Sequence, residues 1–409
     1  MKTLHGGLDH MAGRLKKDRL LNYVISAIFL VLALAGCSFF GSNAPSQTPT
    51  PTSSSFTPSG LLHVEGTRLV DANGHPVVLR GADIGTPFSN MKGWQSGKRP
   101  TDTINSGTLT AMAQQWHMNI LRLQVSNWIY AKYPADFLSQ LDQIVQEANQ
   151  AGLYVVINLE DDAKGGSPYS SIIPRTEDVT FWQAIAAHYK SNPMVLFDLF
   201  NEPQEPDWDT WLHGGGSTSG GGTVVGFQDL VHAVRSTGAQ QVVILEPGSA
   251  GHVKGQNAAA AAEEGGWSNF PLSDAINDPN TMYSLHVYQT IIQPASAQSA
   301  KWGPILNRYP IFYGEWAFLT NGTGKSAVAH CQSLPTNGSQ ANQVVENFLN
   351  YMSSVHANWA AWQFAAGGLI QGTNNYTPTT FPSTLQCGNS KADVGMGSIV
   401  QQYLATHPS

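Results

Sequence analysis

Two glutamates stand out because each closes a short apolar run within a compact polar tripeptide. Glu202 lies in the sequence NEP and Glu315 in the sequence GEW. Two carboxyl groups can divide a reaction between them: a protonated one donates a proton while an ionised one attacks an electrophilic carbon. Cleavage of a glycosidic bond depends on this division, so the pair predicts that type of chemistry if the two side chains meet.

Each glutamate also has a structural interpretation that needs no chemistry. Glu202 could satisfy free backbone N–H groups at the start of a helix. Glu315 could be an ion-pair partner of Arg122, although a catalytic carboxylate would be expected to have such a partner too. The choice therefore depends on the elements that carry these residues.

Eight short apolar runs recur along the chain and begin 29 to 49 residues apart, which is the length of one strand, one helix and two loops. Their hydrophobicity is nearly continuous rather than alternating, as expected for parallel strands buried on both faces. The runs are VVLRGADI from Val77, MNILRLQVS from Met118, YVVINLED from Tyr154, MVLFDLF from Met194, QVVILEPGS from Gln241, MYSLHVYQ from Met282, IFYGEW from Ile311 and AAWQF from Ala360.

Amphipathic segments with helical spacing lie between these runs. One runs from Pro134 to a stop at Gly152, and two others contain Phe227 to Val234 and Val344 to Met352. A doubly wound open sheet would usually carry a glycine-rich phosphate loop after its first strand, and no such loop follows Val77. We therefore predict an α/β fold of the (β/α)8 TIM-barrel type.

In such a barrel, function resides at the carboxyl ends of the strands. Glu202 would follow the fourth strand and Glu315 the seventh, so the two would face each other across the barrel mouth. Further polar or aromatic residues close other runs. His286 and Tyr288 alternate and share one face, which also suits satisfied core residues. The additional candidates are Arg122, Asn201, His286, Tyr288 and Trp362.

These motifs, in this order, resemble family 5 of the glycoside hydrolases, in the cellulase-like barrel clan, over residues 61–409. The resemblance implies that Glu202 is the acid/base and Glu315 the nucleophile of a retaining hydrolase. It further implies that Asn201 binds the sugar 2-hydroxyl, that Arg122 and Tyr288 hold Glu315, and that His286 lies beside Glu202. Trp362 would form the floor of the subsite where cleavage occurs.

The third run departs from the family pattern. The family commonly places a histidine near the end of this strand, whereas the sequence here ends in Glu160-Asp161. A carboxylate in that place leaves the mechanism unchanged and puts the identity of the sugar in doubt.

Composition and net charge indicate which classes of binding partner the protein is suited to. Hydrophobic residues make up 42% of the chain and charged residues 12%, and the formal net charge is -7, which gives no reason to expect nucleic acid. An uncharged, β-linked polysaccharide suits this balance. No second His or Cys stands at ligand spacing from His286, so we expect no metal and no cofactor. We expect a monomer.

The amino-terminal 60 residues read as a targeting segment and a tether. Residues 1–37 combine a basic stretch, an apolar run and the ending LAGC, which resembles a bacterial lipoprotein signal with Cys37 as the lipidated residue. An ordinary secretory signal with an incidental cysteine is the alternative. Residues 38–60 are rich in Ser, Thr and Pro and predict a linker, and residues 61–409 the catalytic domain. We expect an exported protein, either held at the cell surface with the lipid as its only membrane contact or secreted.

Three smaller features complete the expectations. Cys331 and Cys387 fall in loops after the seventh and eighth strands, and we expect a disulfide between them in an exported protein. Trp208 and Trp211 could line a leaving-group subsite or pack under their own loop. The tract GGGSTSGGGT from Gly214 lacks the context of a phosphate loop, so we expect a flexible loop there.

The function expected from the sequence is that of a retaining cellulase or endo-β-1,4-glucanase. A β-mannanase or another β-glycanase on the same fold is the alternative within this class, because the same catalytic residues serve several sugars. A surface lipoprotein that binds carbohydrate without cleaving it is the alternative outside it. The presence of both Glu202 and Glu315 argues against this last possibility.

Overall fold

The computed structural model describes residues 58, 60–85, 88, 90–160, 173–203, 207–217, 222–248, 266–318, 335, 337–385 and 395–407. Cys37, Cys331, Cys387 and Asp161 lie outside these residues, as does the predicted signal segment 1–37 and, apart from Pro58 and Gly60, the predicted linker 38–60. Within the described part of the chain, no helix is both long and apolar enough to cross a bilayer.

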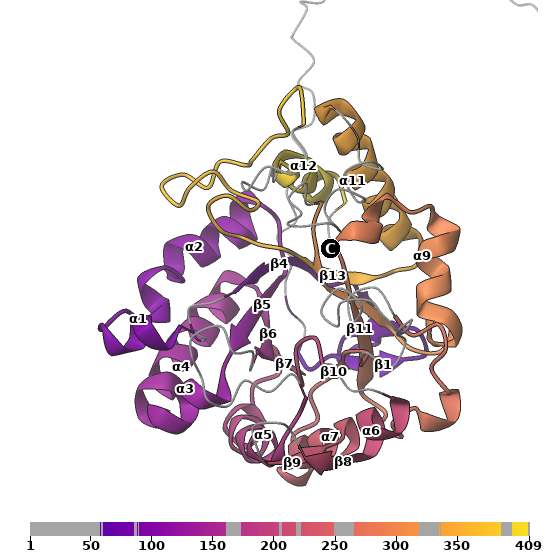
Figure 1. Cartoon of the computed structure of the whole chain (residues 1–409). Coiled ribbons are helices and arrows are strands. Elements are labelled where there is room, and N and C mark those ends of the chain that lie inside the picture. Colours follow the sequence, from indigo (N-terminus) through magenta and orange to yellow (C-terminus); the bar gives the residue numbers. More distant parts are fainter. Residues whose placement is uncertain are drawn as a thin grey trace, which may run out of the picture. The chain divides into compact units, whose positions relative to one another are not determined.

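Eight parallel strands close into a barrel, which confirms the predicted (β/α)8 fold (Figure 1). Every strand falls within or beside one of the eight apolar runs, and its residues are almost all buried. Neighbours in the chain are neighbours in the barrel. In order, the strands are β4 Arg80–Ile84, β5 Ile120–Val125, β6 Tyr154–Leu159, β7 Val195–Asp198, β10 Val243–Leu245, β11 Thr281–Val287, β12 Ile311–Trp316 and β13 Asn358–Ala361.

Helices surround the barrel strands (Figure 1). The predicted amphipathic segments form α4, α7 and α11. Helix α4 begins with Pro134 and ends at Ala151, and it is capped by Gly152, whose φ of 91° is left-handed. The helices and helical turns are α1 Met91–Gln95, η1 Pro100–Asp102, α2 Ser106–Thr110, η2 Ala111–Gln115, α3 Asn127–Lys132, α4 Pro134–Ala151, α5 Thr176–Tyr189, α6 Trp208–His213, α7 Phe227–Ser236, η4 Leu272–Asp274, η5 Gln289–Ile292, α9 Ala295–Trp302, η6 Gly303–Asn307, α11 Gly338–Ser354 and α12 Gly397–Thr406.

A small antiparallel sheet, not expected from the sequence, covers the amino ends of the barrel strands. It consists of β1 His63–Glu65, β2 Arg68–Val70 and β3 Pro76–Val77. Its buried Leu69 belongs to the same apolar cluster as Ile120 and Phe312 of the barrel interior. The backbone N–H of Val64 donates to Asn280 Oδ1 at 2.9 Å, just before β11 begins. This sheet therefore closes the end of the barrel opposite the predicted site.

A second difference concerns the glycine-rich tract. A two-stranded ribbon forms from β8 Gly214–Ser217 and β9 Thr223–Val225, where the sequence indicated a flexible loop. Gly214 has a φ of 70°, and a Cβ there would lie 2.6 Å from the carbonyl oxygen of Val224, so only glycine fits this pairing.

Candidate active site

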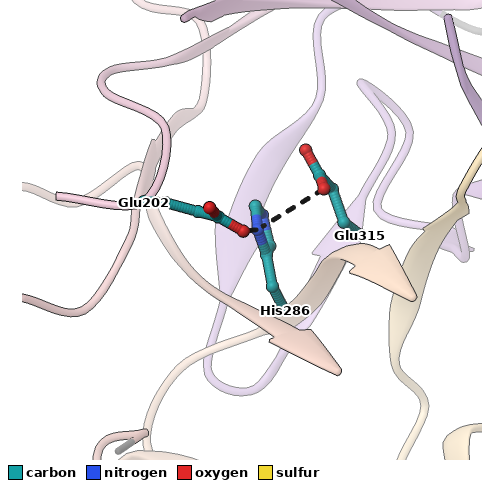
Figure 2. A group of neighbouring side chains, drawn as sticks. All are labelled: Glu202, His286 and Glu315. Carbon is teal, nitrogen blue, oxygen red and sulfur yellow. Dashed lines mark hydrogen bonds and ion pairs between the residues drawn. The ribbon is translucent and has the colours of Figure 1, made fainter. Parts of the chain in front are cut away.

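Glu202 and Glu315 meet at the carboxyl end of the barrel. Glu202 follows β7 and Glu315 lies on β12, and His286 of β11 stands between their carboxylates (Figure 2). One atom of each side chain lies within 4.8 Å of the other two. The Glu315 side chain is 5% exposed and that of Glu202 is 27% exposed, so Glu202 is the more open of the two to solvent.

The close approach of β11 and β12 depends on the glycine of the GEW motif. His286 pairs with Glu315 in the register of these strands. A Cβ at Gly314 would lie 2.6 Å from Ser284 Oγ and 2.9 Å from His286 Nε2. Only glycine therefore lets the His286 ring lie against the strand that carries Glu315.

Three side chains donate hydrogen bonds to the Glu315 carboxylate. Arg122 Nη1 and Gln124 Nε2 both donate to Oε1 at 2.9 Å, and the Tyr288 hydroxyl donates to Oε2. Arg122 and Gln124 share the inward face of β5 because they are two residues apart. These bonds fix the orientation of the carboxylate.

Arg122 lies at the centre of a buried network of acids. Its Nε donates to Asp198 Oδ2 at 2.8 Å, and its Nη1 to Asp83 Oδ2 at 3.1 Å. Its Nη2 donates to Glu246 Oε1 and to Asn201 Oδ1, both at 2.8 Å. Burial disfavours the guanidinium charge, but the surrounding carboxylates outweigh burial and raise the pKa of Arg122 well above its usual value.

Each ring nitrogen of His286 faces a carboxylate oxygen. Its Nδ1 lies 2.9 Å from Glu202 Oε1, and its Nε2 lies 3.2 Å from Glu246 Oε1. Burial alone would lower the pKa of His286, but Glu246 and Glu315, with the hydrogen bond to Glu202, raise it well above the usual value. The carboxylates around the ring therefore favour its protonated form.

The remaining acids of the network respond differently to burial. Burial raises the pKa of Asp83 well above its ordinary value and that of Asp198 to about 7, in spite of Arg122. For Glu246, burial is outweighed by His286 and Arg122, which lower its pKa. Ionised Glu246 thus faces both cations of the site.

The backbone at Glu202 adopts an unusual conformation. Its φ of 44° lies in the left-handed region, which costs a residue with a side chain about 1–3 kcal/mol. The N–H of Glu202 donates to Glu246 Oε2 at 2.7 Å. The side chain of Glu202 bonds to His286 in this conformation. The two hydrogen bonds, to Glu246 and to His286, offset the cost of the left-handed backbone.

Glu160 directly follows β6, in the run whose ending Glu160-Asp161 departs from the family pattern. Its side chain is buried and its Oε2 accepts a hydrogen bond from Gln124 Nε2 at 2.8 Å. Gln124 therefore links Glu160 to Glu315. Trp362 follows β13 with its N–H bonded to the Trp316 carbonyl at 2.9 Å, and its ring lies close to Gly85 and Gln124.

The two tryptophans after the NEP motif have different environments. Trp211 is fully buried, and its Nε1 donates to the Glu246 carbonyl oxygen at 2.8 Å. Trp208 is partly buried and stacks on Trp267, with ring centroids 5.5 Å apart. Trp211 is therefore a packing residue, in contact with Phe227, Trp267 and Phe270, and does not line an open subsite.

Glu202, His286 and Glu315 could together offer three ligand atoms to a metal ion. The same atoms already bond to one another and to their neighbours: Nδ1 of His286 with Glu202, and Oε2 of Glu315 with the Tyr288 hydroxyl. A cation would have to displace these bonds. The set is therefore better suited to moving protons than to holding a metal.

Sequence reasoning missed four residues of this network: Asp83, Gln124, Asp198 and Glu246. Each lies within or directly after an apolar run, where a polar side chain is conspicuous. The signal that could have found Gln124 is its spacing of two residues from Arg122, which places both on one face of a strand.

The fold and the site together define a (β/α)8 barrel with a paired-glutamate centre at its carboxyl end. A family model described as cellulase, glycosyl hydrolase family 5, matches residues 70–368. The chain therefore belongs to this cellulase family.

Individual relatives are distant in sequence. Endoglucanase E-5 of Thermobifida fusca is 22% identical over 310 residues, which cover 75% of this chain and 56% of the relative. Endoglucanase MaCel5A of Microbulbifer sp. is also 22% identical over 310 residues, covering 75% of this chain and 51% of that protein. The chain thus spans about half the length of these relatives.

Solved structures show the same fold. The β-glucanase SdGluc5_26A of Saccharophagus degradans, in complex with cellotetraose, matches 90% of this chain and 100% of its own, with a TM-score of 0.61 and 18% identity. The catalytic domain of Thermobifida fusca endoglucanase Cel5A matches 85% of this chain and 98% of its own, with a TM-score of 0.56 and 20% identity.

Proposed function

We propose that this protein is a retaining glycoside hydrolase that cleaves a β-1,4-linked glucan, with Glu202 as acid/base and Glu315 as nucleophile. The observation that carries the proposal is the approach of the two carboxylates, whose nearest atoms lie within 4.8 Å. Retaining enzymes keep their carboxyl groups about 5–5.5 Å apart, whereas inverting enzymes need about 6.5–9.5 Å to admit a water molecule.

The reaction proceeds in two displacements. First, Glu315 bonds to the anomeric carbon while protonated Glu202 gives its proton to the departing glycosidic oxygen. Water then attacks the same carbon and loses a proton to Glu202, and the bond to Glu315 breaks. Arg122, Gln124 and Tyr288 stabilise the Glu315 carboxylate as it leaves, through the hydrogen bonds that they donate to it.

Asn201 suits the role of binding the sugar 2-hydroxyl. Its Oδ1 accepts a hydrogen bond from Arg122 Nη2 at 2.8 Å, which fixes the orientation of the amide. Its Nδ2 is then directed away from Arg122 and can donate to a substrate hydroxyl. Trp362, partly buried beside Gly85 and Gln124, suits the floor of the cleavage subsite.

The choice of glucan rests on the relatives, which are named as endoglucanases and a β-glucanase. β-Mannan and other β-glycans are the alternatives, because the third run ends in Glu160-Asp161 where the family commonly has a histidine that would bind a substrate hydroxyl. Assays on carboxymethylcellulose, barley β-glucan, mannan and xylan decide among them. We expect the highest kcat/KM on one of the two glucans, and a preference for mannan or xylan would contradict this choice.

Two variants test the catalytic assignment. Glu315→Ala should abolish hydrolysis of every substrate, because no covalent intermediate can form. Glu202→Ala should lose at least about 100-fold in kcat/KM on cellotetraose but remain close to the parent on 2,4-dinitrophenyl β-cellobioside, whose leaving group needs no proton. Parental activity of either variant on cellotetraose would refute the assignment.

We also propose that the chain is exported as a monomer, carries a lipid on Cys37, and forms a disulfide between Cys331 and Cys387. The support is the sequence alone: the LAGC ending, the Ser/Thr/Pro-rich stretch 38–60 and the loop positions of the two cysteines. Mass spectrometry of the membrane fraction should find a diacylglyceryl Cys37. Two free thiols at Cys331 and Cys387 in the exported protein would refute the disulfide.

A further inference from the structure

Glu246 is a buried carboxylate to which the proposed mechanism gives no duty. It directly follows β10, is 1% exposed, and receives contacts from three separate parts of the barrel mouth. The backbone N–H of Glu202 donates to Oε2 at 2.7 Å, and Arg122 Nη2 donates to Oε1 at 2.8 Å. His286 Nε2 lies 3.2 Å from the same Oε1.

These contacts hold Glu202 at both of its ends. At the backbone, Glu246 Oε2 binds the N–H of the residue whose φ is left-handed. At the side chain, Glu202 Oε1 bonds to His286 Nδ1 at 2.9 Å, and the opposite nitrogen of that ring lies against Glu246 Oε1. A single carboxylate therefore contacts both the backbone of Glu202 and the ring that bonds to its side chain.

Glu246 is itself held in place. The Nε1 of fully buried Trp211 donates to the Glu246 backbone carbonyl at 2.8 Å, which ties this position to the helix that follows the NEP motif. We propose that Glu246 is the positioning residue of the acid/base, fixing Glu202 and His286 for proton transfer to the leaving oxygen. This inference rests on the catalytic role proposed for Glu202.

The charge of Glu246 matters as well as its shape. A carboxylate oxygen faces each ring nitrogen of His286, an arrangement that suits the doubly protonated imidazolium. A charged ring stabilises the carboxylate that Glu202 becomes once it has given up its proton. The titratable groups that interact with His286 are Asp83 of β4, Asp198 of β7, Glu202 after β7, Glu246 after β10 and Glu315 of β12. Arg122 of β5 pairs with Glu246 in the same network.

Glutamine cannot replace Glu246, although it has nearly the same shape. The Glu202 N–H, Arg122 Nη2 and protonated His286 Nε2 are all donors. A glutamine NH2 group would have to face either the Glu202 N–H or the two cations, and one contact would become donor against donor. Glu246→Gln therefore disturbs the position of Glu202 with little change in side-chain volume.

The test compares two leaving groups. In Glu246→Gln, kcat/KM on cellotetraose should fall about 100-fold, while kcat/KM on 2,4-dinitrophenyl β-cellobioside should stay within about 3-fold of the parent. A purely structural role would lower both values equally, and that result would overturn the proposal. If Glu246→Gln does not fold, Glu246→Asp keeps the charge but not the reach to the Glu202 N–H, and should show the same dependence on leaving group.

Asp198→Asn is the matched control. Asp198 is a buried acid of the same network that accepts from Arg122 Nε through Oδ2, and within the described residues its Oδ1 has no hydrogen-bond partner. An asparagine can keep the first bond and place its NH2 at the second position. Whatever activity this variant loses, it should lose equally on both substrates, whereas a selective loss on cellotetraose would remove the special role of Glu246.

A second readout needs no turnover and separates this inference from the proposed function. NMR of protein labelled with 15N-histidine follows the protonation of His286, whose signals are assigned by their loss in His286→Gln. We expect the ring to lose its second proton at least about one pH unit lower in Glu246→Gln than in the parent. An unchanged titration would overturn the inference, even if the parent cleaves no β-glycan.

Discussion

At the residue scale, the site is a set of carboxylates whose behaviour is set by what surrounds each one. Glu315 is nearly buried and receives donors from Arg122, Gln124 and Tyr288, while Glu202 is more exposed and bonds to His286. Glu315, the proposed nucleophile, is thus fixed in place, and Glu202, the proposed acid/base, is more open to solvent.

Tyr288 provides a direct test of how Glu315, the proposed nucleophile, is held. In Tyr288→Phe, Glu315 Oε2 loses the donor that the hydroxyl supplies. We expect kcat/KM to fall about 10- to 100-fold on both cellotetraose and 2,4-dinitrophenyl β-cellobioside, because attack by Glu315 is needed whatever the leaving group. Steady-state kinetics with both substrates measure this. A loss confined to cellotetraose would mean that Tyr288 serves proton transfer instead.

The proposed catalytic pair could be predicted from the sequence because each glutamate closes an apolar run in a recognisable tripeptide. The sequence did not predict the roles of three other acids, Asp83, Asp198 and Glu246. Their contacts depend on which strands are adjacent across the barrel and on the register of those strands. A polar residue inside an apolar run signals only that a partner is needed. The partner here, Arg122, lies 39, 76 and 124 residues away along the chain.

At the scale of elements, the barrel strands were predictable because parallel strands are buried on both faces and leave continuous apolar runs. The sheet β1–β3 was not, because its strands have only two or three residues and mix polar with apolar side chains. The β8–β9 ribbon was missed for a related reason, since glycine has a low strand propensity and tertiary pairing overrides it.

Leu69 tests whether β1–β3 stabilises the barrel without contributing to catalysis. Leu69→Ala removes a buried side chain from the cluster at the amino ends of the strands and should lower the free energy of unfolding by about 2–4 kcal/mol. Below the unfolding transition, kcat/KM should equal that of the parent. Val64→Ala, at a half-buried position of the same sheet, should cost less. Urea unfolding and steady-state kinetics measure the two effects, and a large loss of kcat/KM would contradict this separation.

The start of α5 carries a buried acid whose protonation affects stability. Asp178 accepts the N–H of Arg175 at 2.8 Å and contacts Asn127, and burial raises its pKa to about 7 from the ordinary 3.8. Folding thus favours the protonated form, so this carboxyl stabilises the protein at low pH and its contribution falls as pH rises from about 4 to 7. The slope is at most about 1.4 kcal/mol per pH unit.

In Asp178→Asn this contribution is absent, because the side chain cannot ionise. We expect the free energy of unfolding of the parent to decrease more steeply between pH 5 and pH 7 than that of the variant. Urea unfolding at pH 5, 6 and 7 gives the difference between the two slopes. Equal slopes would show that Asp178 keeps an ordinary pKa in the folded protein.

At the scale of the whole molecule, the small sheet that stabilises the barrel and the residues proposed to carry the reaction lie at opposite ends of the barrel. The small sheet β1–β3 closes the amino end, and the charged network occupies the carboxyl end. The barrel and the family could both be predicted from the sequence, because eight runs and two motifs occur in the order that the fold requires. The preferred glycan could not, because it depends on loop side chains that contact the substrate.

A metal-independent reaction is expected of the molecule as a whole. Glu202, His286 and Glu315 bond to one another and to their neighbours through the atoms that would ligate a cation. Dialysis against EDTA should therefore leave kcat/KM on cellotetraose within about 2-fold of its starting value. A loss restored by one divalent cation, and by no other, would show that a metal takes part.

The central claim is that Glu315 bonds to the sugar while Glu202 serves its leaving group. The most direct measurement is to incubate the protein with 2,4-dinitrophenyl 2-deoxy-2-fluoro-β-cellobioside, which forms the intermediate but slows its hydrolysis, and to locate the label by peptide mass spectrometry. We predict one fluorocellobiosyl group per chain, attached to Glu315 and absent in Glu315→Gln. A label on any other residue would contradict the account, as would turnover of cellotetraose that releases the α-anomer first.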